Sequence, residues 1–241
     1  MLSKFTVIVP TYNEAENIEP LVRELERVLK NFNFNILFVD DNSPDGTAER
    51  VERLAKHKRN ISCLKRENKR GLSSAVLDGV MSCNSHFFAV IDGDLQHDTQ
   101  LLPVMFDLMN EDKADLIIAS RYISGGDISS WRLDRKFLSV LSNYFSSMVL
   151  KENLSDPMSG FFACKTKTFI RSAPQMSRIG FKVLFDYLIS TDIELRITEI
   201  PLCFKSRNAG SSKLNISVAF DFLKLLLKGV IKTLNHRIMR S

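Results

Sequence analysis

Short apolar runs alternate with helical stretches along the first half of the chain, and this alternation constrains the fold more than any other feature. The runs are Phe5–Val9, Ile36–Val39, Ile61–Leu64, Phe87–Ile91 and Leu116–Ala119. Between them, apolar residues recur every three or four positions, as they do on one face of a helix. The pattern predicts an α/β fold with a mostly parallel sheet and helices on both faces.

The regular alternation of strands and helices ends after Gly125. No stretch rich in proline, glycine or serine divides the chain into separate domains. The elements expected beyond that point are helices at about 135–151 and 180–191 and strands at 160–164 and 197–204. Pro201 removes a backbone donor from the last strand, which predicts an edge position. A long helix should begin near Ile216, so we expect one domain over residues 1–215 and a basic amphipathic helix over residues 216–241.

The net charge of +5 is concentrated at the end of the chain. Residues 213–241 hold six Lys or Arg and one Asp, so residues 1–212 sum to zero. A neutral body without an aromatic and basic platform argues against nucleic acid, whereas a basic end suits an anionic membrane surface. We expect neither a signal peptide nor a transmembrane helix, because the first strand begins almost at once and no run of about 18 uncharged apolar residues exists.

Polar clusters follow three of the predicted strands. They occupy Thr11–Glu14, Asp40–Ser43 and Asp92–His97. Ligands of open α/β sheets bind outside the carboxyl ends of the strands, so we expect these clusters to line one crevice.

Asp92 and Asp94 flank a single glycine in the third cluster. Two carboxylates at this spacing are suited to a hard divalent cation, Mg²⁺ or Mn²⁺, together with phosphate oxygens. Gln96 and His97 are candidates for a further ligand or for orienting one. The alternative interpretation is a solvated turn, since Asp-Gly is common in turns.

Two common nucleotide-binding motifs are absent. The first strand is followed by Pro10–Glu14 and not by G-x-G-x-x-G, and the chain has no Walker-type GxxxxGK[ST]. A glycine-rich turn therefore does not hold phosphates after the first strand, and a metal ion would have to do more of that work.

The motifs together resemble the family 2 glycosyltransferases of GT-A fold. The shared motifs of the first half are PTYNE, VDDNSPDGT, GLSSAVLDG and IDGDLQH. The second half resembles one branch, the dolichyl-phosphate (polyprenyl-phosphate) mannose synthases. The residues that carry this narrower resemblance are ASRY at 119–122, Trp131 with Arg135, SDPMSGFFA at 155–163, GFK at 180–182 and RNAGSSK at 207–213.

The resemblance, which covers about residues 4–215, implies a role for each matching position. The donor nucleoside would be held by Pro10, Tyr12, Glu14 and Asp41. The metal and the diphosphate would be held by Asp92, Asp94 and Gln96. The acceptor phosphate would be bound by Arg121, Arg135 and Ser139. Arg207 and Lys213 would close over the donor diphosphate or the acceptor, and the residues expected to be catalytic are Asp92, Asp94, Arg121 and Arg207.

The implied reaction is the metal-dependent transfer of a hexose to a polyprenyl or dolichyl monophosphate, with inversion at the anomeric carbon. The implied hexose is mannose and the implied donor is GDP-mannose. Near pH 7 a phosphate monoester already carries nucleophilic anionic oxygens, so the lack of a general-base candidate is consistent with this acceptor. One alternative is a UDP-sugar transferase, for example of glucose, acting on polyprenyl phosphate or another acceptor. Another is a catalytically silent subunit that binds nucleotide sugar in a membrane complex.

Several residues depart from the family pattern. Gly93 stands where alanine is frequent, and Asp98 replaces the usual proline after Gln-His. The chain has no QxxRW motif, so it does not resemble the processive polysaccharide synthases. It also lacks the C-terminal transmembrane helices of many relatives, which leaves its mode of membrane attachment open.

The last helix carries one polar stripe on an otherwise apolar surface. The stripe is formed by Asp221, Lys224, Lys228, Lys232 and Asn235. Such a helix suits the membrane interface, but it would equally pack on the domain or on another subunit. We expect the protein to lie on the cytoplasmic face of a membrane, in contact with the lipid surface or with a small membrane-protein partner.

Overall fold

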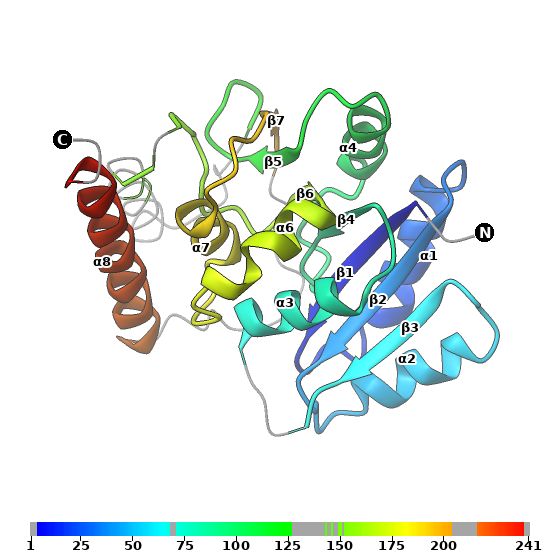
Figure 1. Ribbon diagram of the computed structural model, residues 1–241. Helices are drawn as coiled ribbons and strands as arrows, with labels where there is room; N and C mark the ends of the chain where they lie inside the picture. Colours follow the sequence, from blue (N-terminus) through cyan, green and yellow to red (C-terminus); the bar gives the residue numbers. More distant parts are fainter. Residues whose placement is uncertain are drawn as a thin grey trace.

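The computed structural model describes residues 4–67, 71–126, 143, 146, 149–150, 152–203 and 216–238, and the side chains of the last helix from 221 to 232. Strands in this part of the chain form one sheet in the order β3-β2-β1-β4-β6-β5-β7 (Figure 1). Their bounds are β1 Phe5–Thr11, β2 Phe34–Asp40, β3 Ile61–Lys65, β4 Phe87–Val90, β5 Leu116–Ser120, β6 Phe162–Lys165 and β7 Ile197–Pro201.

The sheet is mostly parallel, which confirms the predicted fold class. β1 runs parallel to β2 and β4, with Val7 opposite Ile36 and Ala89. β6 is antiparallel to both of its neighbours, β4 and β5, and this reversal was not predicted. β7 pairs with β5 at the edge of the sheet, as Pro201 indicated.

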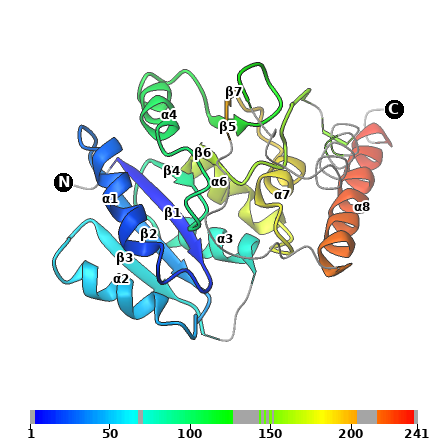
Figure 2. The same ribbon diagram turned by 180° about the vertical axis from the view of Figure 1, so that it is seen from behind.

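Helices cover both faces of the sheet (Figures 1 and 2). Their bounds are α1 Ile18–Val28, α2 Thr47–Ala55, α3 Leu72–Ser82, α4 Leu101–Asn110, α6 Thr166–Ser172, the 3₁₀ turn η1 Ala173–Gln175, α7 Val183–Ser190 and α8 Ile216–Ile238. Side chains alternate along each strand, so Val7 and Val9 pack with α1 and α4, whereas Ile8 packs with α3. The short helix α6 was not predicted, and the helix expected at 135–151 lies almost entirely outside the described residues.

The terminal helix α8 begins at the predicted Ile216 and packs against α7. Leu225 of α8 is buried with Phe185 and Ile189 of α7 in a small core of its own. No helix in the described residues is long and apolar enough to cross a membrane.

Candidate active site at the carboxyl edge of the sheet

The loops after β1 and β2 are joined by side chains of the second loop. Three successive backbone N–H groups of the first loop donate to this second loop: Asn13 to Ser43 Oγ, Glu14 to Thr47 Oγ1 and Ala15 to Asp45 Oδ2, each at 3.0 Å. Burial alone would raise the pKa of Asp45, but hydrogen bonds from Thr47 and Ala15 hold it below its ordinary value. The predicted donor residues Tyr12 and Glu14 therefore lie on a firmly positioned loop, and Pro10 lies just before it, at the end of β1.

The adjacent carboxylates of Asp40 and Asp41 accept hydrogen bonds from different parts of the site. Asp40 is fully buried and accepts hydrogen bonds from Thr11 Oγ1 at 3.1 Å and from Ser43 Oγ at 2.6 Å, so it joins the two loops. Asp41 accepts from Arg66 Nε at 2.7 Å and from the backbone N–H of Gly71 at 2.8 Å. Asp41, which is predicted to bind the donor nucleoside, is thus hydrogen-bonded to the end of β3 and to the start of α3.

Arg66 is a site residue that the sequence analysis missed. It is only 4% exposed and also donates to Ser74 Oγ at 2.9 Å, Asp78 Oδ2 at 3.2 Å and the carbonyl of Gly71 at 3.1 Å. Arg66 directly follows β3, so its position at a strand end was the available signal.

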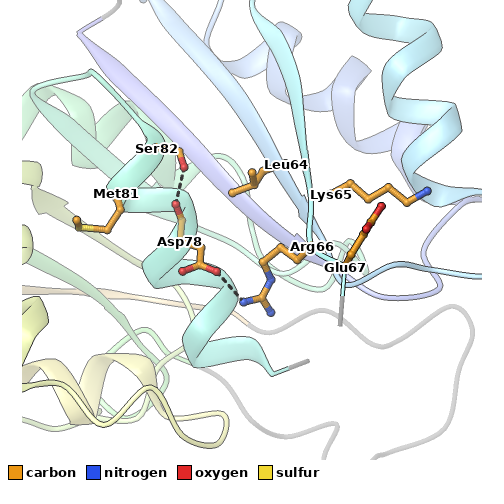
Figure 3. Close-up of a pocket in the computed structure, with 7 residues that line it drawn as sticks. All are labelled: Leu64, Lys65, Arg66, Glu67, Asp78, Met81 and Ser82. Carbon is orange, nitrogen blue, oxygen red and sulfur yellow. Dashed lines mark hydrogen bonds and ion pairs between the residues drawn. The ribbon is translucent and has the colours of Figure 1, made fainter. Parts of the chain in front are cut away.

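A groove of about 400 Å³ lies on the side of Arg66 that faces Asp78 (Figure 3). It is lined by Leu64, Lys65, Arg66, Glu67, Asp78, Met81 and Ser82. None of the site residues predicted from the sequence lines this groove. It borders the pair of Arg66 and Asp41 and does not include the carboxylates after β4.

The predicted metal carboxylates lie in the turn that follows β4. Asp92 and Asp94 are both half-buried, and the backbone N–H of the buried Gln96 donates to Asp94 Oδ1 at 3.2 Å. Gly93 packs on the loop after β1, because a Cβ there would lie 3.3 Å from Thr11 Cγ2 and 3.5 Å from Glu14 Cγ. The first and third polar clusters are therefore in contact, as the strand-end argument predicted.

His97 orients Asp92. The backbone N–H of Asp92 donates to His97 Nδ1 at 3.0 Å, so the proton of a neutral His97 ring is on Nε2. Nε2 lies 3.5 Å from Asp92 Oδ2. The ring is buried and stacks on Phe161, with 5.2 Å between the centroids. These contacts hold His97 against Asp92.

Arg121 directly follows β5 and binds Asp156. Its Nε and Nη2 donate to the two oxygens of Asp156, each at 2.7 Å. Asp115, which precedes β5, binds Lys165 and Arg196. Burial alone would lower the pKa of Arg121, but the bonds to Asp156 outweigh it and raise the pKa, and the charge of Asp92 acts in the same direction.

The turn at residues 155–160 connects this arginine to Asp92. A Cβ at Gly160 would lie 3.8 Å from both carboxylate oxygens of Asp92, so glycine keeps the space beside them clear. The carboxylate of Glu199 on β7 accepts from the backbone N–H groups of Ser155 at 2.9 Å and of Asp156 at 3.0 Å. Glu199 was not predicted from the sequence, although an acid within the run ITEIP was a signal that could have identified it.

The residues after β4 suit a hard divalent cation that takes part of its shell from a ligand. Their donors are carboxylate oxygens, which Mg²⁺ and Mn²⁺ prefer. Among the residues described, no three His, Cys, Asp or Glu side chains are grouped closely enough for a metal site. Mg²⁺ commonly binds one or two carboxylates together with substrate phosphates and water, and the two carboxylates fit that arrangement.

Arg135, Ser139, Arg207 and Lys213, which the sequence analysis assigned to the acceptor phosphate and to the closing loop, lie outside the described residues. The other predicted positions share the carboxyl edge of the sheet. They are Pro10, Tyr12, Glu14, Asp41, Asp92, Asp94, Gln96 and Arg121.

The fold is that of GT-A glycosyltransferases. The structure is similar to glucosyl-3-phosphoglycerate synthase from Mycobacterium tuberculosis, solved with Mn²⁺, UDP-glucose and phosphoglyceric acid. The TM-score is 0.69 at 15% identity, and the match covers 94% of this chain and 79% of that one.

Residues 6–172 match the family model described as glycosyl transferase family 2. The chain is 34% identical over 223 residues to the dolichol-phosphate mannosyltransferase of Pyrococcus furiosus, which covers 92% of this chain and 62% of the relative. It is also 34% identical over 238 residues to the Saccharomyces cerevisiae protein of that name, covering 94% and 86%. The chain spans less than two thirds of the Pyrococcus protein. The present chain therefore belongs to glycosyl transferase family 2.

Proposed function

We propose that the protein transfers mannose from GDP-mannose to a polyprenyl or dolichyl monophosphate, with inversion at the anomeric carbon. The names of the relatives that match more than nine tenths of the chain supply the sugar and the acceptor. The observation that carries the proposal is the contact of Gly160 with Asp92, because the turn that contains Gly160 also holds Asp156, the partner of Arg121. This contact supports a role for the two carboxylates at the donor diphosphate and for Arg121 at the acceptor phosphate.

The site supports a reaction that needs no general base. Asp156, the carboxylate bonded to Arg121, is fully buried and accepts three hydrogen bonds from that residue, so it is poorly placed to take a proton from an acceptor. A phosphate monoester has a second pKa of about 6 and attacks as an anion near pH 7. The protein then has to position the two substrates and control their charge.

Mg²⁺ or Mn²⁺ bound at Asp92 and Asp94 would serve as a Lewis acid that stabilises the departing diphosphate. In this proposal Gln96 joins Asp92 and Asp94 in holding the metal and the diphosphate, and His97 fixes the orientation of Asp92. Tyr12, Glu14 and Asp41 hold the nucleoside at the neighbouring strand ends, with Arg66 fixing Asp41. Arg135 and Ser139 join Arg121 at the acceptor phosphate, and Arg207 and Lys213 close over the donor diphosphate or the acceptor.

A lipid acceptor places the reaction at a membrane. We infer that residues 1–215 form the catalytic domain and act on the cytoplasmic face, attached peripherally through the lipid surface or through a small membrane-protein partner. The basic segment 213–241 supports attachment to an anionic surface.

Transfer of labelled sugar to a short-chain polyprenyl phosphate tests the proposal. GDP-mannose and UDP-glucose are compared, with Mg²⁺ or Mn²⁺ and with EDTA. We expect mannose transfer that EDTA abolishes. Glucose transfer alone would support the UDP-sugar alternative, and nucleotide binding without any transfer would support the silent subunit.

Asp94→Asn tests the carboxylate pair within that assay. We expect kcat to fall about 100-fold or more, because charge stabilisation of the leaving group is lost. Asp98→Asn is the matched control, a carboxylate in the same loop that has no role in the proposal, and it should stay near wild type. Equal activity of Asp94→Asn and wild type would exclude the metal role.

A further inference from the structure

Helix α8 exposes a stripe of large apolar side chains. Leu223, Leu227, Val230 and Ile231 are 52%, 55%, 43% and 57% exposed, and their spacing places them on one face of the helix. Single exposed leucines are ordinary on protein surfaces, whereas a continuous apolar stripe marks an interaction site.

The lysines of the predicted polar stripe hold this face outward. Lys228 Nζ lies 2.9 Å from Asp186 Oδ1, 2.8 Å from Ser190 Oγ and 2.6 Å from the carbonyl of Gln175. Lys232 Nζ donates to the carbonyl of Ser190 at 3.0 Å. Asp186 is fully buried, so Lys228 supplies the charge that this carboxylate requires. The helix therefore turns part of its polar stripe toward the domain.

The loop before α7 adds two apolar side chains beside α8. Ile179 and Phe181 are 41% and 45% exposed. Between them, Gly180 has a φ of +73° and touches α8, because a Cβ there would lie 3.1 Å from Asp221 Cβ. Asp186 also accepts from the backbone N–H and the hydroxyl of Ser177, both at 2.8 Å, so one buried carboxylate fixes the loop and the helix.

This loop also reaches the carboxyl edge of the sheet. The backbone N–H of Ser73, at the start of α3, donates to the carbonyl of Gly180 at 3.1 Å. Gly71, two residues earlier, donates to Asp41. Figures 1 and 2 both show the first turns of α8 on the same side of the molecule as the carboxyl ends of β1 and β2.

We propose that these side chains form an apolar ridge that inserts into the interfacial layer of a bilayer containing anionic lipid. The ridge consists of Ile179, Phe181, Leu223, Leu227, Val230 and Ile231. Lys224, 66% exposed at its side chain, belongs to the same helix, and residues 213–241 carry a net +5, of which Lys228 and Lys232 are paired with Asp186 and Asp192 of the domain. A second copy of the chain would bring like charges together, whereas an anionic lipid surface complements them. This inference rests on the proposed function, because a lipid acceptor would bring the enzyme to the membrane surface.

Co-sedimentation of the full chain with vesicles tests the ridge. Phosphatidylcholine vesicles with and without ~30% phosphatidylglycerol are compared, because the basic segment should favour the anionic ones. We expect wild type to bind the anionic vesicles, and Leu227→Asp and Phe181→Asp each to weaken binding about tenfold or more, as expected for loss of one inserted side chain. Val104→Asp is the matched control, since Val104 on α4 is 47% exposed and outside the ridge.

Point variants are preferable to deletion of residues 217–241, because the deletion leaves Asp186 buried without Lys228. Thermal unfolding shows whether each variant is folded, and light scattering gives its mass. The two ridge substitutions lie on different elements, so the test can be made with either variant if the other does not fold. Absence of vesicle binding by wild type, or wild-type binding by a folded ridge variant, overturns the ridge. A wild-type dimer that Leu227→Asp makes monomeric overturns it too, by assigning the stripe to self-association.

The vesicle assay contains no sugar donor, so its result is independent of the proposed reaction. Transfer to a water-soluble short-chain acceptor is measured in parallel. Ridge variants should retain this transfer within about threefold, because the ridge residues contact neither substrate in the proposal. Vesicle binding by a wild-type protein that transfers nothing would refute the proposed function and leave the ridge standing.

Discussion

The guanidinium of Arg121 binds both carboxylate oxygens of Asp156, and the backbone N–H of Arg121 donates to one of them at 3.0 Å. Asp156 is fully buried, so the pair is shielded from water. It fastens the end of β5 to the 155–160 turn, whose Gly160 lies against Asp92. The arginine assigned to the acceptor phosphate is therefore also part of the structure that shapes the carboxylate site.

Asp156→Asn should destabilise the protein strongly. The substitution leaves Arg121, whose side chain is 10% exposed, without a charged partner, which typically costs about 3–5 kcal/mol. Urea unfolding measures the change in the free energy of unfolding. Arg121→Lys keeps the charge but loses the two-point geometry, so we expect a smaller loss in that variant. Wild-type stability in Asp156→Asn would show that the pair does not hold the turn.

Glu199→Gln should weaken acceptor use more than donor use. Glu199 binds the backbone of Ser155 and Asp156, and a glutamine offers a neutral oxygen in place of two charged ones. The turn that positions Arg121 would then loosen, so KM for the polyprenyl phosphate should rise about tenfold while KM for GDP-mannose changes little. Glu194→Gln, an exposed acid just before β7, is the control. An equal rise in both KM values would point to a general structural defect.

The strand-end rule explains how much of the site was predictable. A polar residue after a buried parallel strand lies at a common edge, and this logic brought Glu14, Asp41 and Asp92 together without any knowledge of contacts. It extends to Arg66, which stands directly after β3 and was overlooked. Glu199 lay beyond its reach, because this residue acts from within an edge strand through two backbone N–H groups.

The direction of a strand and the partner of a charged side chain were harder to predict than the face of the element on which a side chain lies. The run from Phe162 to Lys165 is apolar like the parallel strands, and alternation states which face a side chain takes but not which way the strand runs. Lys228 belongs to the predicted polar stripe, but its partner Asp186 lies 42 residues away inside the apolar run VLFDYLIS. A lone acid in such a run was the available signal, since buried carboxylates require a partner.

Arg66→Lys should reduce nucleotide affinity with the fold retained. Lysine keeps a positive charge near Asp41 but cannot donate simultaneously to Asp41, Ser74 and Asp78. If Asp41 holds the nucleoside, its carboxylate becomes less well fixed, and we expect the Kd for GDP to rise about tenfold by calorimetry. Arg59→Lys, an exposed arginine before β3, should leave the Kd unchanged. Unaltered GDP binding in folded Arg66→Lys would remove Arg66 and Asp41 from the donor site.

Asp115 should contribute stability that acid removes. Hydrogen bonds from Arg196 and then from Lys165 lower its pKa well below the ordinary value, against the opposing effect of burial. A carboxylate with a lowered folded-state pKa stabilises the protein fully above its unfolded pKa of about 3.9, and this stability is lost as the pH falls toward the folded pKa. Asp115→Asn should therefore cost about 1–2 kcal/mol at pH 7.

The difference between wild type and Asp115→Asn should shrink steadily below about pH 4, where the unfolded chain already binds the proton. Urea unfolding of both proteins between pH 7 and pH 3 measures it. Glu111→Gln serves as the control, because Glu111 pairs with Lys113 in an exposed contact whose side chains are 55% and 63% exposed. Its difference from wild type should stay small throughout, as is usual for surface pairs. A gap for Asp115→Asn that widened with acid would reverse the assigned direction of the pKa shift and with it the role of Arg196 as the dominant partner.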